Sequence, residues 1–519
     1  MQILINNIKM PLEHKIEDVL LAAQKAVRQH FVSAKNFSVY KQSIDARRKS
    51  NIRYVYSVMA EIPDGSETLG IKNITAAADS GVHISKRALK QRPVVVGMGP
   101  AGLFAAYVLT LSGNPPIIIE RGAGIEERQR AVKLFWETGA LDPNSNVQFG
   151  EGGAGTFSDG KLNTGIKDKR QRFILETFVK FGAPPEILYK AKPHIGTDIL
   201  RDVIVNMRKY LKECGCEIRF KTCMTDVKIR NGRIEEIELS SGGALKSGCV
   251  FLAIGHSSRD TYKVLESRGC VLKQKPFAMG VRIEHRQQMI GMAQYGDAWS
   301  MLPAADYKLT YNGKERSCYS FCMCPGGYVV NASSEPGMLA VNGMSNHDRG
   351  GENANSALVV NVRPEDFGSG HPLAGIELQR KYERLAFEAG RGGYAAPVQL
   401  ARDFVIGRAS DSPGDVSPSY TGKITLADLR GCLPEFVSET LCDGLKYFDN
   451  KISGFLGSGL LTGIETRTSA PVRIVRNDDF SAAGVMGLYP IGEGAGYAGG
   501  IVSAALDGLK AALSVTEPL

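Results

Sequence analysis

The chain of 519 residues is too long for a single compact core, because chains beyond about 250–300 residues usually divide into domains. Its 43% hydrophobic and 23% charged content is ordinary for a globular protein. Ten cysteines in this length exclude the disulfide framework of a small secreted domain, and no Cys/His set has zinc-binding spacing. Composition therefore favours a multidomain protein without a metal site.

The net charge of +9 is concentrated near the N-terminus. Residues 1–92 hold 15 Lys and Arg against 8 Asp and Glu, and the densest basic cluster is Lys41, Arg47, Arg48, Lys49 and Arg53. Such a module could dock RNA or an acidic protein. We favour a solvated surface, because charge clusters usually face solvent and no RNP-like or helix-turn-helix motif accompanies this one.

Residues 1–75 predict a small basic α+β domain. Strand-like stretches at 2–10, 37–45 and 52–62 surround a stretch at 16–31 with apolar residues at helical spacing. A polar connection with one helical segment follows over about 63–92, and residues 76–92 form the linker. The N-terminus lacks the apolar core of a signal peptide, so we expect a cytoplasmic protein.

Residues 93–119 carry no charge and are long enough to span a bilayer. Glycines and prolines interrupt them, so we predict a strand, a helix and a second strand, with no membrane contact. Between strand and helix stand Gly97, Gly99, Pro100, Ala101 and Gly102. Glycine at these positions permits a tight turn, close approach of a pyrophosphate and close helix–strand packing. Glu120, which ends the second strand, can accept hydrogen bonds from ribose hydroxyls.

A second glycine-rich helix start lies near the C-terminus. A short strand leads into Gly492 and Glu493, and a helix follows Gly499, Gly500 and Ile501. Such a helix N-terminus can stabilise the negative charge of a reduced flavin, and Glu493 can bond the ribityl or pyrophosphate region. Enzymes that bind only NAD do not need this second element. The two motifs together therefore predict FAD.

Residues 217–254 predict a β-meander that leads into an Ala253-Ile254-Gly255 turn. An apolar strand ending in Ala-x-Gly is typical of FAD domains, where the turn passes the adenosine. We predict that the backbone of Val227 contacts the adenine edge.

These motifs define an α/β fold with a discontinuous Rossmann-like FAD-binding domain. We predict its first part at 93–270 and its C-terminal part at 476–519, with a mixed α/β substrate or cap domain inserted at 271–475.

With these motifs the chain resembles the glutathione-reductase-type FAD superfamily, and more narrowly the bacterial family of uncharacterised FAD-dependent dehydrogenases. The stretches that carry the resemblance include NVQFGEGGAGTFSDGKL, FCMCPGGYVVNASSE, ETRTSAPVRI and LYPIGEGAGYAGGIVSAALDG. The resemblance implies FAD, but it implies no substrate. It also implies that a loop wraps the flavin, with the cofactor contacts Arg121, Gly152, Gly153, Ala154, Gly155, Lys161 and Leu162.

Candidates for the chemistry come from the inserted domain. Cys322 and Cys324 could be redox or nucleophilic thiols, although their spacing is not CxxC and a structural role is the more ordinary one. Arg282 and His285 could bind an anion or deliver a proton, or belong to a strand surface. Glu465 and Arg467 line the cavity or form an internal ion pair. For Asn353 and Asn355 we favour turns over substrate binding.

The sequence thus predicts an FAD-dependent oxidoreductase that transfers hydride through flavin N5 to or from a small molecule. It offers no second strand–GxGxxG–helix unit for NAD(P)H, so the electron donor stays open. The alternatives are a flavin monooxygenase and a flavoprotein that docks RNA or an acidic protein through its N-terminal domain.

Overall fold

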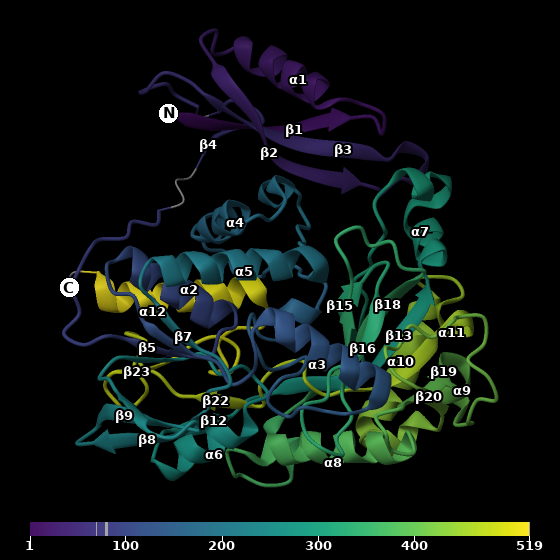
Figure 1. Cartoon of the computed structure of the whole chain (residues 1–519). Coiled ribbons are helices and arrows are strands. Elements are labelled where there is room, and N and C mark those ends of the chain that lie inside the picture. Colours follow the sequence, from purple (N-terminus) through teal and green to yellow (C-terminus); the bar gives the residue numbers. More distant parts are fainter. Residues whose placement is uncertain (69, 78–80, 518–519) are drawn as a thin grey trace.

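The computed structural model describes residues 1–68, 70–77 and 81–517 (Figure 1). Within these residues the chain is a mixed α/β protein whose largest sheets have four, five and seven strands. Residues 78–80 of the predicted linker lie outside the described residues. No described helix is long and apolar enough to span a membrane. No described group of three or more His, Cys, Asp or Glu residues could hold a metal ion.

The N-terminal sheet has the order β2-β3-β1-β4. Its strands are β1 (Gln2–Met10), β2 (Lys35–Asp45), β3 (Arg53–Glu61) and β4 (Ile74–Ala76). Helix α1 (Ile16–Arg28) covers one face, with Val19, Ala23 and Val27 buried at helical spacing against the sheet. We predicted a helical segment within 63–92. This prediction is wrong for the described residues there, which instead supply the edge strand β4.

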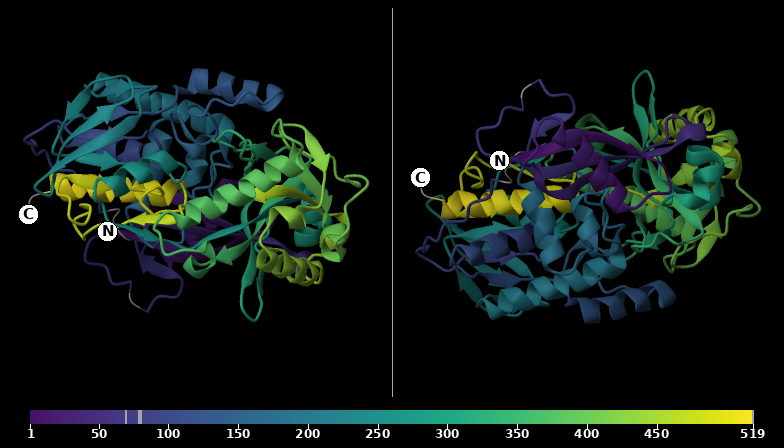
Figure 2. Two further views of the ribbon diagram at one scale, coloured as in Figure 1. Left: turned by 90° about the horizontal axis from the view of Figure 1, so that it is seen from below. Right: turned by 90° about the horizontal axis from the view of Figure 1, so that it is seen from above.

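This N-terminal unit lies across the two larger units, which are built on the five-stranded and the seven-stranded sheet (Figures 1 and 2). The Gln42 amide donates to the Tyr189 carbonyl at 2.7 Å, and the Ala191 amide donates to the Gln42 carbonyl at 2.8 Å. The short helix η1 (Lys49–Asn51) also packs on η4 (Gly296–Met301). The unit therefore contacts both of the larger units that enclose the cavity described below.

The five-stranded sheet is entirely parallel, with the order β23-β11-β5-β6-β7. Its strands are β5 (Val94–Val96), β6 (Ile117–Ile119), β7 (Glu217–Arg219), β11 (Val250–Leu252) and β23 (Leu488–Pro490). The three valines of β5 are buried, as expected for a parallel strand covered on both faces. Strand β23 comes from the far end of the chain, so this unit is discontinuous in sequence.

Helices α2 (Pro100–Leu111) and α12 (Ile501–Thr516) lie side by side on this sheet. They approach closely because Gly508 has no side chain: a Cβ atom there would lie 2.0 Å from the Ala101 carbonyl oxygen. The same unit contains α3 (Ile125–Thr138), η2 (Ala154–Phe157), α4 (Gln171–Lys180), η3 (Pro185–Leu188), α5 (Thr197–Glu213) and α6 (Arg259–Ser267). The predicted meander forms the antiparallel strands β8 (Met224–Arg230), β9 (Arg233–Leu239) and β10 (Ala244–Lys246).

The seven-stranded sheet has the order β14-β15-β18-β13-β21-β19-β20 and is antiparallel except for the pair β19–β20. Its strands are β13 (Phe277–Arg286), β14 (Thr310–Asn312), β15 (Ser317–Cys324), β18 (Asn353–Val362), β19 (Ala396–Leu400), β20 (Ile424–Leu426) and β21 (Leu460–Glu465). We call the unit around this sheet the cap. Its central strands β13 and β18 are almost wholly buried.

The cap helices are α7 (Gln287–Tyr295), η5 (Pro364–Phe367), α8 (Ala374–Ala389), α9 (Ala401–Ile406), η6 (Leu429–Cys432), α10 (Glu435–Asp449) and α11 (Phe455–Ser458). Two small strand pairs complete the described structure: β16 (Tyr328–Asn331) with β17 (Val341–Met344), and β12 (Leu272–Gln274) with β22 (Val472–Ile474). The pair β12–β22 joins the chain where it enters and leaves the cap, and so fixes the cap against the parallel sheet (Figure 1).

Candidate cofactor and substrate site

A cavity of about 360 Å³ lies between the parallel sheet and the cap. Its lining comes from the carboxyl ends of β5, β6 and β11, from the first turns of α2 and α12, and from β15, β17 and β21 of the cap. Ligands of open α/β sheets bind outside the carboxyl ends of the strands. The cavity therefore has the position of a cofactor site with a second wall for a substrate.

Two positions beside the turn between β5 and α2, Gly97 and Gly102, have room only for glycine. Gly97 has φ +98°, and a Cβ atom there would lie 2.3 Å from the Ala253 carbonyl oxygen. A Cβ atom on Gly102 would lie 2.0 Å from the Gly97 carbonyl oxygen. The N-cap of α2 is Gly99, which gives no side-chain cap, and Gly99, Pro100 and Ala101 line the cavity. The unpaired amides of this helix start can thus bind an anion.

Glu120 is held rigidly at the end of β6. One carboxylate oxygen accepts the Met98 amide at 2.8 Å, and the other accepts the amides of Gly122 and Gly150 at 2.9 and 3.0 Å. Because a carboxylate has about four acceptor positions, one stays available to a ribose hydroxyl in the cavity. The neighbouring Arg121 donates to Asp260 at 2.7 Å and lies over the Phe149 ring.

The C-terminal motif forms the opposite side of the cavity. Helix α12 begins at Ile501 after the N-cap Gly500, again without a side-chain cap, and Gly499 to Ile501 line the cavity. Glu493 also lines it, and burial raises the pKa of this carboxyl to about 7. Gly492 does not line the cavity. Its amide donates to Asp507 of α12 at 2.7 Å, and this bond fixes the turn that follows β23.

These features fit a dinucleotide with a pyrophosphate. Two helix starts without side-chain caps share one cavity. The backbones of the lining residues Gly99 and Gly153 pack together, so that a Cβ on Gly153 would lie 3.0 Å from Gly99 Cα. Gln148 also lines the cavity, and its buried Oε1 atom has no hydrogen-bond partner. A polar ligand would satisfy that oxygen.

The cap wall is organised by Arg282 of β13, which is fully buried. Its guanidinium donates to Glu465 at 2.7 Å, to Asn355 at 2.6 Å and to Asn342 at 3.2 Å. It also donates to the Cys322 carbonyl oxygen at 3.2 and 3.3 Å. Glu465, Asn342 and Cys322 line the cavity but Arg282 does not, so Arg282 positions the wall instead of contacting a ligand.

Lys161 enters this wall from the loop before α4. Its ammonium lies 3.2 Å from Asp159 and 3.8 Å from the Cys324 sulfur. Lys161, Arg282, Cys322 and Cys324 are called the Cys322 cluster below. The Cys324 thiol donates to the Cys322 carbonyl oxygen at 3.3 Å. The interaction of the Cys324 side chain with that of Cys322, and the positive charges of Lys161 and Arg282, hold the pKa of Cys322 well below its usual range.

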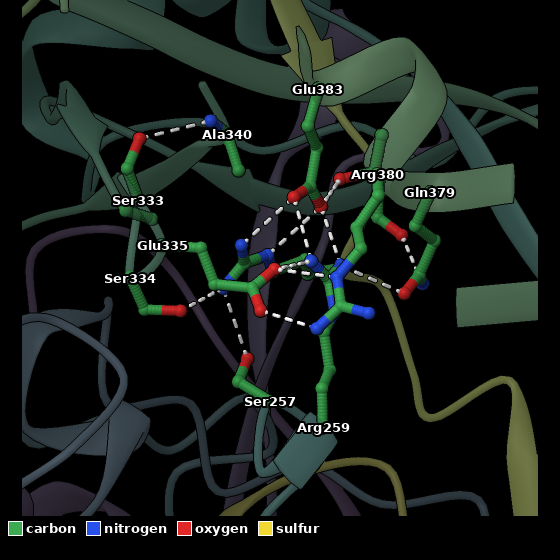
Figure 3. A network of polar contacts seen from close by, with 12 residues as sticks. Ser257, Arg259, Ser333, Ser334, Glu335, Ala340, Gln379, Arg380 and Glu383 are labelled. Atoms are coloured by element: carbon green, nitrogen blue, oxygen red, sulfur yellow. Dashed lines mark hydrogen bonds and ion pairs between the residues drawn. The ribbon is translucent and has the colours of Figure 1, made fainter. Parts of the chain in front are cut away.

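A second group of charges joins the cap to the parallel sheet (Figure 3). Glu383 of α8 accepts from Arg259 of α6 at 2.8 and 2.9 Å, and from Arg467, which follows β21, at 2.9 and 3.0 Å. Arg467 lines the cavity and donates to the hydroxyls of Ser257 and Ser334. Arg259, Glu383 and Arg467 are called the Glu383 cluster.

Comparisons with known proteins agree with this site. Residues 276–468 match a family model described as "FAD-dependent protein, C-terminal domain-like", and residues 1–61 match a domain of unknown function. An uncharacterized protein of Clostridium beijerinckii is 46% identical over 539 residues, which cover 100% of this chain and 99% of the relative. The chain belongs to this family of bacterial FAD-dependent proteins.

Solved flavoprotein structures are similar over most of the chain at low identity. NikD, an amino acid oxidase of nikkomycin biosynthesis, is 12% identical with a TM-score of 0.35, covering 82% of this chain and 93% of its own. CtdE in complex with FAD is 12% identical with a TM-score of 0.32, covering 82% and 83%. A geranylgeranyl bacteriochlorophyll reductase-like protein of Thermoplasma acidophilum is 13% identical with a TM-score of 0.33, covering 81% and 76%.

In this FAD-dependent protein the cavity gathers most of the residues that we predicted for the site. They are Gly97, Gly99, Pro100, Ala101, Glu120, Arg121, Gly153, Ala154, Gly155, Lys161, Ala253, Gly255, Cys322, Arg467, Glu493, Gly499, Gly500 and Ile501. Seven predicted residues do not line the cavity: Gly102, Gly152, Leu162, Val227, Arg282, Cys324 and Gly492. Which of the lining residues contact the FAD stays a prediction.

Three predictions need correction. Val227 does not reach the cavity: its side chain is buried in an apolar cluster and its amide is bonded to Asp226, whereas Cys223 and Met224 line the cavity at the start of β8. Asn353 and Asn355 do not form turns, because both are buried within β18. His285 is buried outside the lining, with Nε2 bonded to the Phe455 carbonyl oxygen at 2.8 Å.

Several lining residues escaped the sequence analysis. His256 and Ser257 directly follow the predicted Ala253–Gly255 turn, so that turn could have indicated them. Burial, with the charges of Arg467 and Arg259, lowers the pKa of His256 to about 3, so the imidazole is neutral. Gln148, Asp159 and Asn342 had no local pattern that marked them.

Proposed function

We propose that the protein is an FAD-dependent oxidoreductase that exchanges hydride with a small-molecule substrate bound against the cap wall. The supporting observation is that one cavity joins both predicted FAD elements to a wall of polar side chains from the cap. Bound FAD supplies the two-electron chemistry, and the protein supplies binding, orientation and electrostatics.

The residues divide this work between the two walls. On the parallel-sheet side, the helix starts at Gly99 and Gly500 offer backbone amides and positive dipole ends to a pyrophosphate and to a reduced, anionic flavin. On the cap side, Asn342, Glu465 and Arg467 place neutral, acidic and basic side chains in one wall of the cavity. Such a mixed wall suits a small polar molecule.

The electron donor can be tested directly. Purified holoprotein is titrated with NADPH and then NADH under anaerobic conditions while the visible absorption band of the flavin is followed. Rapid bleaching by either nucleotide would establish a nicotinamide-driven reductase. If dithionite reduces the flavin but neither nucleotide does, NAD(P)H is rejected as the direct electron donor. Metabolites are then tested for their ability to reduce the flavin.

The same sample separates reduction from oxygen chemistry. After reduction, air is admitted, and oxygen uptake and products are measured with and without candidate substrates. We expect quantitative reoxidation without a hydroxylated product, whereas substrate-stimulated oxygen uptake with hydroxylation would identify a monooxygenase. A bound flavin that neither dithionite nor any organic donor reduces would overturn the proposal.

Docking of RNA or an acidic protein by the N-terminal unit stays a prediction. Arg47 is largely exposed and pairs with Asp45, the last residue of β2, and neither residue lines the cavity. Nucleic-acid binding that weakens steeply with salt and disappears on deletion of residues 1–92 would support such docking.

A further inference from the structure

Two of the three cysteines of β15, Cys322 and Cys324, lie where the pairing of the cap sheet is interrupted. The pairing of β15 with β18 shifts register between Phe321 and Cys324, so Cys322 and Met323 form a bulge. Bulges re-aim side chains beside active sites. Here the bulge brings Cys322 to the cavity lining while Cys324 stays fully buried behind it.

Cys322 has an unusual backbone conformation, with φ +44°. This left-handed region costs a non-glycine residue about 1–3 kcal/mol, and it persists only when the surroundings enforce it. Arg282 supplies that constraint, since both of its terminal nitrogens donate to the Cys322 carbonyl oxygen while Glu465 holds the guanidinium. A buried ion pair therefore keeps Cys322 directed at the cavity.

The surroundings of the two sulfurs favour a thiolate. The Cys324 thiol donates to the Cys322 carbonyl oxygen at 3.3 Å, and the Cys324 side chain also interacts with that of Cys322. The ammonium of Lys161 lies 3.8 Å from the Cys324 sulfur. Asp159 and Glu493 add nearby carboxyls, but the interaction with the Cys324 side chain and the two cations outweigh them, and the pKa of Cys322 falls. Low-pKa thiolates of this kind are the reactive ones.

Cys249, Cys270 and Cys318 lack these features. Burial alone raises the pKa of Cys249 to about 12 and that of Cys270 to about 11. Cys318 lies on the same strand β15, fully buried, and does not line the cavity. Cysteines that merely fill a core behave in this way. The Cys322–Cys324 pair therefore differs from a packing pair.

We propose that Cys322 and Cys324 form a redox-active dithiol in the wall of the FAD cavity, with Cys322 as the thiolate. This inference rests on the proposed function, because bound FAD is the electron acceptor. When the Cys322 thiolate and the Cys324 thiol join in a disulfide, one S–S bond forms and the S–H bond of Cys324 breaks. Two electrons and one proton leave the pair, and these are what the oxidised flavin takes up on reduction to its anion.

The decisive experiment counts electrons and thiols in the holoprotein. Air-oxidised protein is titrated with dithionite under anaerobic conditions, and free thiols are counted after denaturation before and after the titration. We expect four electrons per FAD in the parent protein, and two thiols fewer than the ten cysteines before reduction. Cys322→Ser and Cys324→Ser are each expected to take up two electrons, whereas the matched control Cys318→Ala keeps four.

A second measurement on the parent protein tests the proposal even if the serine variants do not fold. Peptide mass mapping of the air-oxidised parent should find the Cys322–Cys324 disulfide and its loss on reduction. Two electrons per FAD together with ten free thiols in the parent would overturn the dithiol, while a reducible flavin would leave the oxidoreductase standing. A flavin that cannot be reduced would overturn the proposed function, and the thiol count would still decide the fate of the pair.

Discussion

Two buried groups of charges, the Glu383 cluster and the Cys322 cluster, differ in how completely they are paired. In the Glu383 cluster the carboxylate accepts five hydrogen bonds, four from Arg259 and Arg467 and one from the Thr466 hydroxyl at 2.7 Å. Burial opposes the ionisation of Glu383, but the two guanidiniums outweigh it and hold the pKa of this carboxyl well below its usual range.

The Cys322 cluster is less completely paired and opens onto the cavity. Its Cys322 sulfur, together with the nearby Glu493 carboxyl and Gln148 Oε1, faces the cavity with capacity for further interactions. Saturated buried networks fix a structure, whereas groups held with spare capacity are available to a ligand. The comparison indicates that the Glu383 cluster holds the cap on the parallel sheet, while the Cys322 cluster serves the chemistry.

The largest effect should follow from breaking the saturated cluster. Glu383→Gln takes the carboxylate partner from buried Arg467 and leaves buried Arg259 paired with Glu335, and removal of one partner of a buried ion pair costs about 3–5 kcal/mol. We expect that loss in the free energy of unfolding, measured by urea denaturation. Glu377→Gln is the matched control, because Glu377 is exposed and pairs only with Arg380 on the same helix. Equal stability of the two variants would contradict a structural role for the cluster.

A second variant should remove the cofactor without unfolding the protein. A Cβ atom on Gly99 would lie 3.8 Å from Gly153 Cα, which is ordinary contact, so Gly99→Val strains no backbone. Its methyl groups would instead fill the cavity at the start of α2. We expect FAD affinity to fall about 100-fold, which corresponds to about 2.8 kcal/mol, with the apoprotein melting temperature unchanged.

The control for this variant is Gly370→Ala, which meets open space away from the cavity and should bind FAD normally. Flavin absorbance and fluorescence titration of the apoprotein measure the affinity. Undiminished FAD binding by Gly99→Val would place the pyrophosphate elsewhere.

The FAD side of the site could be predicted from sequence because its constraints are local. Gly97 adopts φ +98° in the turn, Gly102 packs against the Gly97 carbonyl oxygen of the same turn, and Glu120 follows its strand directly. The arrangement of residues on the cap side could not be predicted from the sequence, because it depends on contacts between distant segments. Arg282 and Glu465 are 183 residues apart, and the bulge that exposes Cys322 depends on pairing with β18. The sequence therefore listed Cys322 and Arg282 as candidates but could not show that one positions the other.

A smaller effect on stability should come from replacing Glu493, whose carboxyl lines the cavity. The folded pKa of Glu493, about 7, lies above the ordinary value of 4.5. The folded apoprotein thus binds a proton more tightly than the unfolded chain, and this group lowers stability progressively as pH rises from 4.5 to 7. Glu493→Gln should raise the melting temperature of the apoprotein at pH 8 and leave it nearly unchanged at pH 4.5.

The exposed Glu439→Gln is the control for this pH dependence and should shift both melting temperatures alike. In the holoprotein, Glu493→Gln should weaken FAD binding, because the ribityl hydroxyls lose a carboxylate acceptor. A gain in stability that is equal at both pH values would contradict the raised pKa.

The smallest effect on stability should come from breaking an ion pair that is exposed to solvent. Lys133 and Glu137 are four residues apart on α3 at 3.7 Å, and their side chains are 76% and 60% exposed. Solvent and salt screen such a pair, and its geometry is not fixed by packing, so it contributes about 0.3–0.5 kcal/mol. Lys133→Gln should therefore change the urea midpoint only slightly, and the change should vanish in high salt. The loss in Glu383→Gln should persist in the same salt, because buried charges are screened much less. If salt abolished both effects, burial would not be what separates the two kinds of ion pair in this protein.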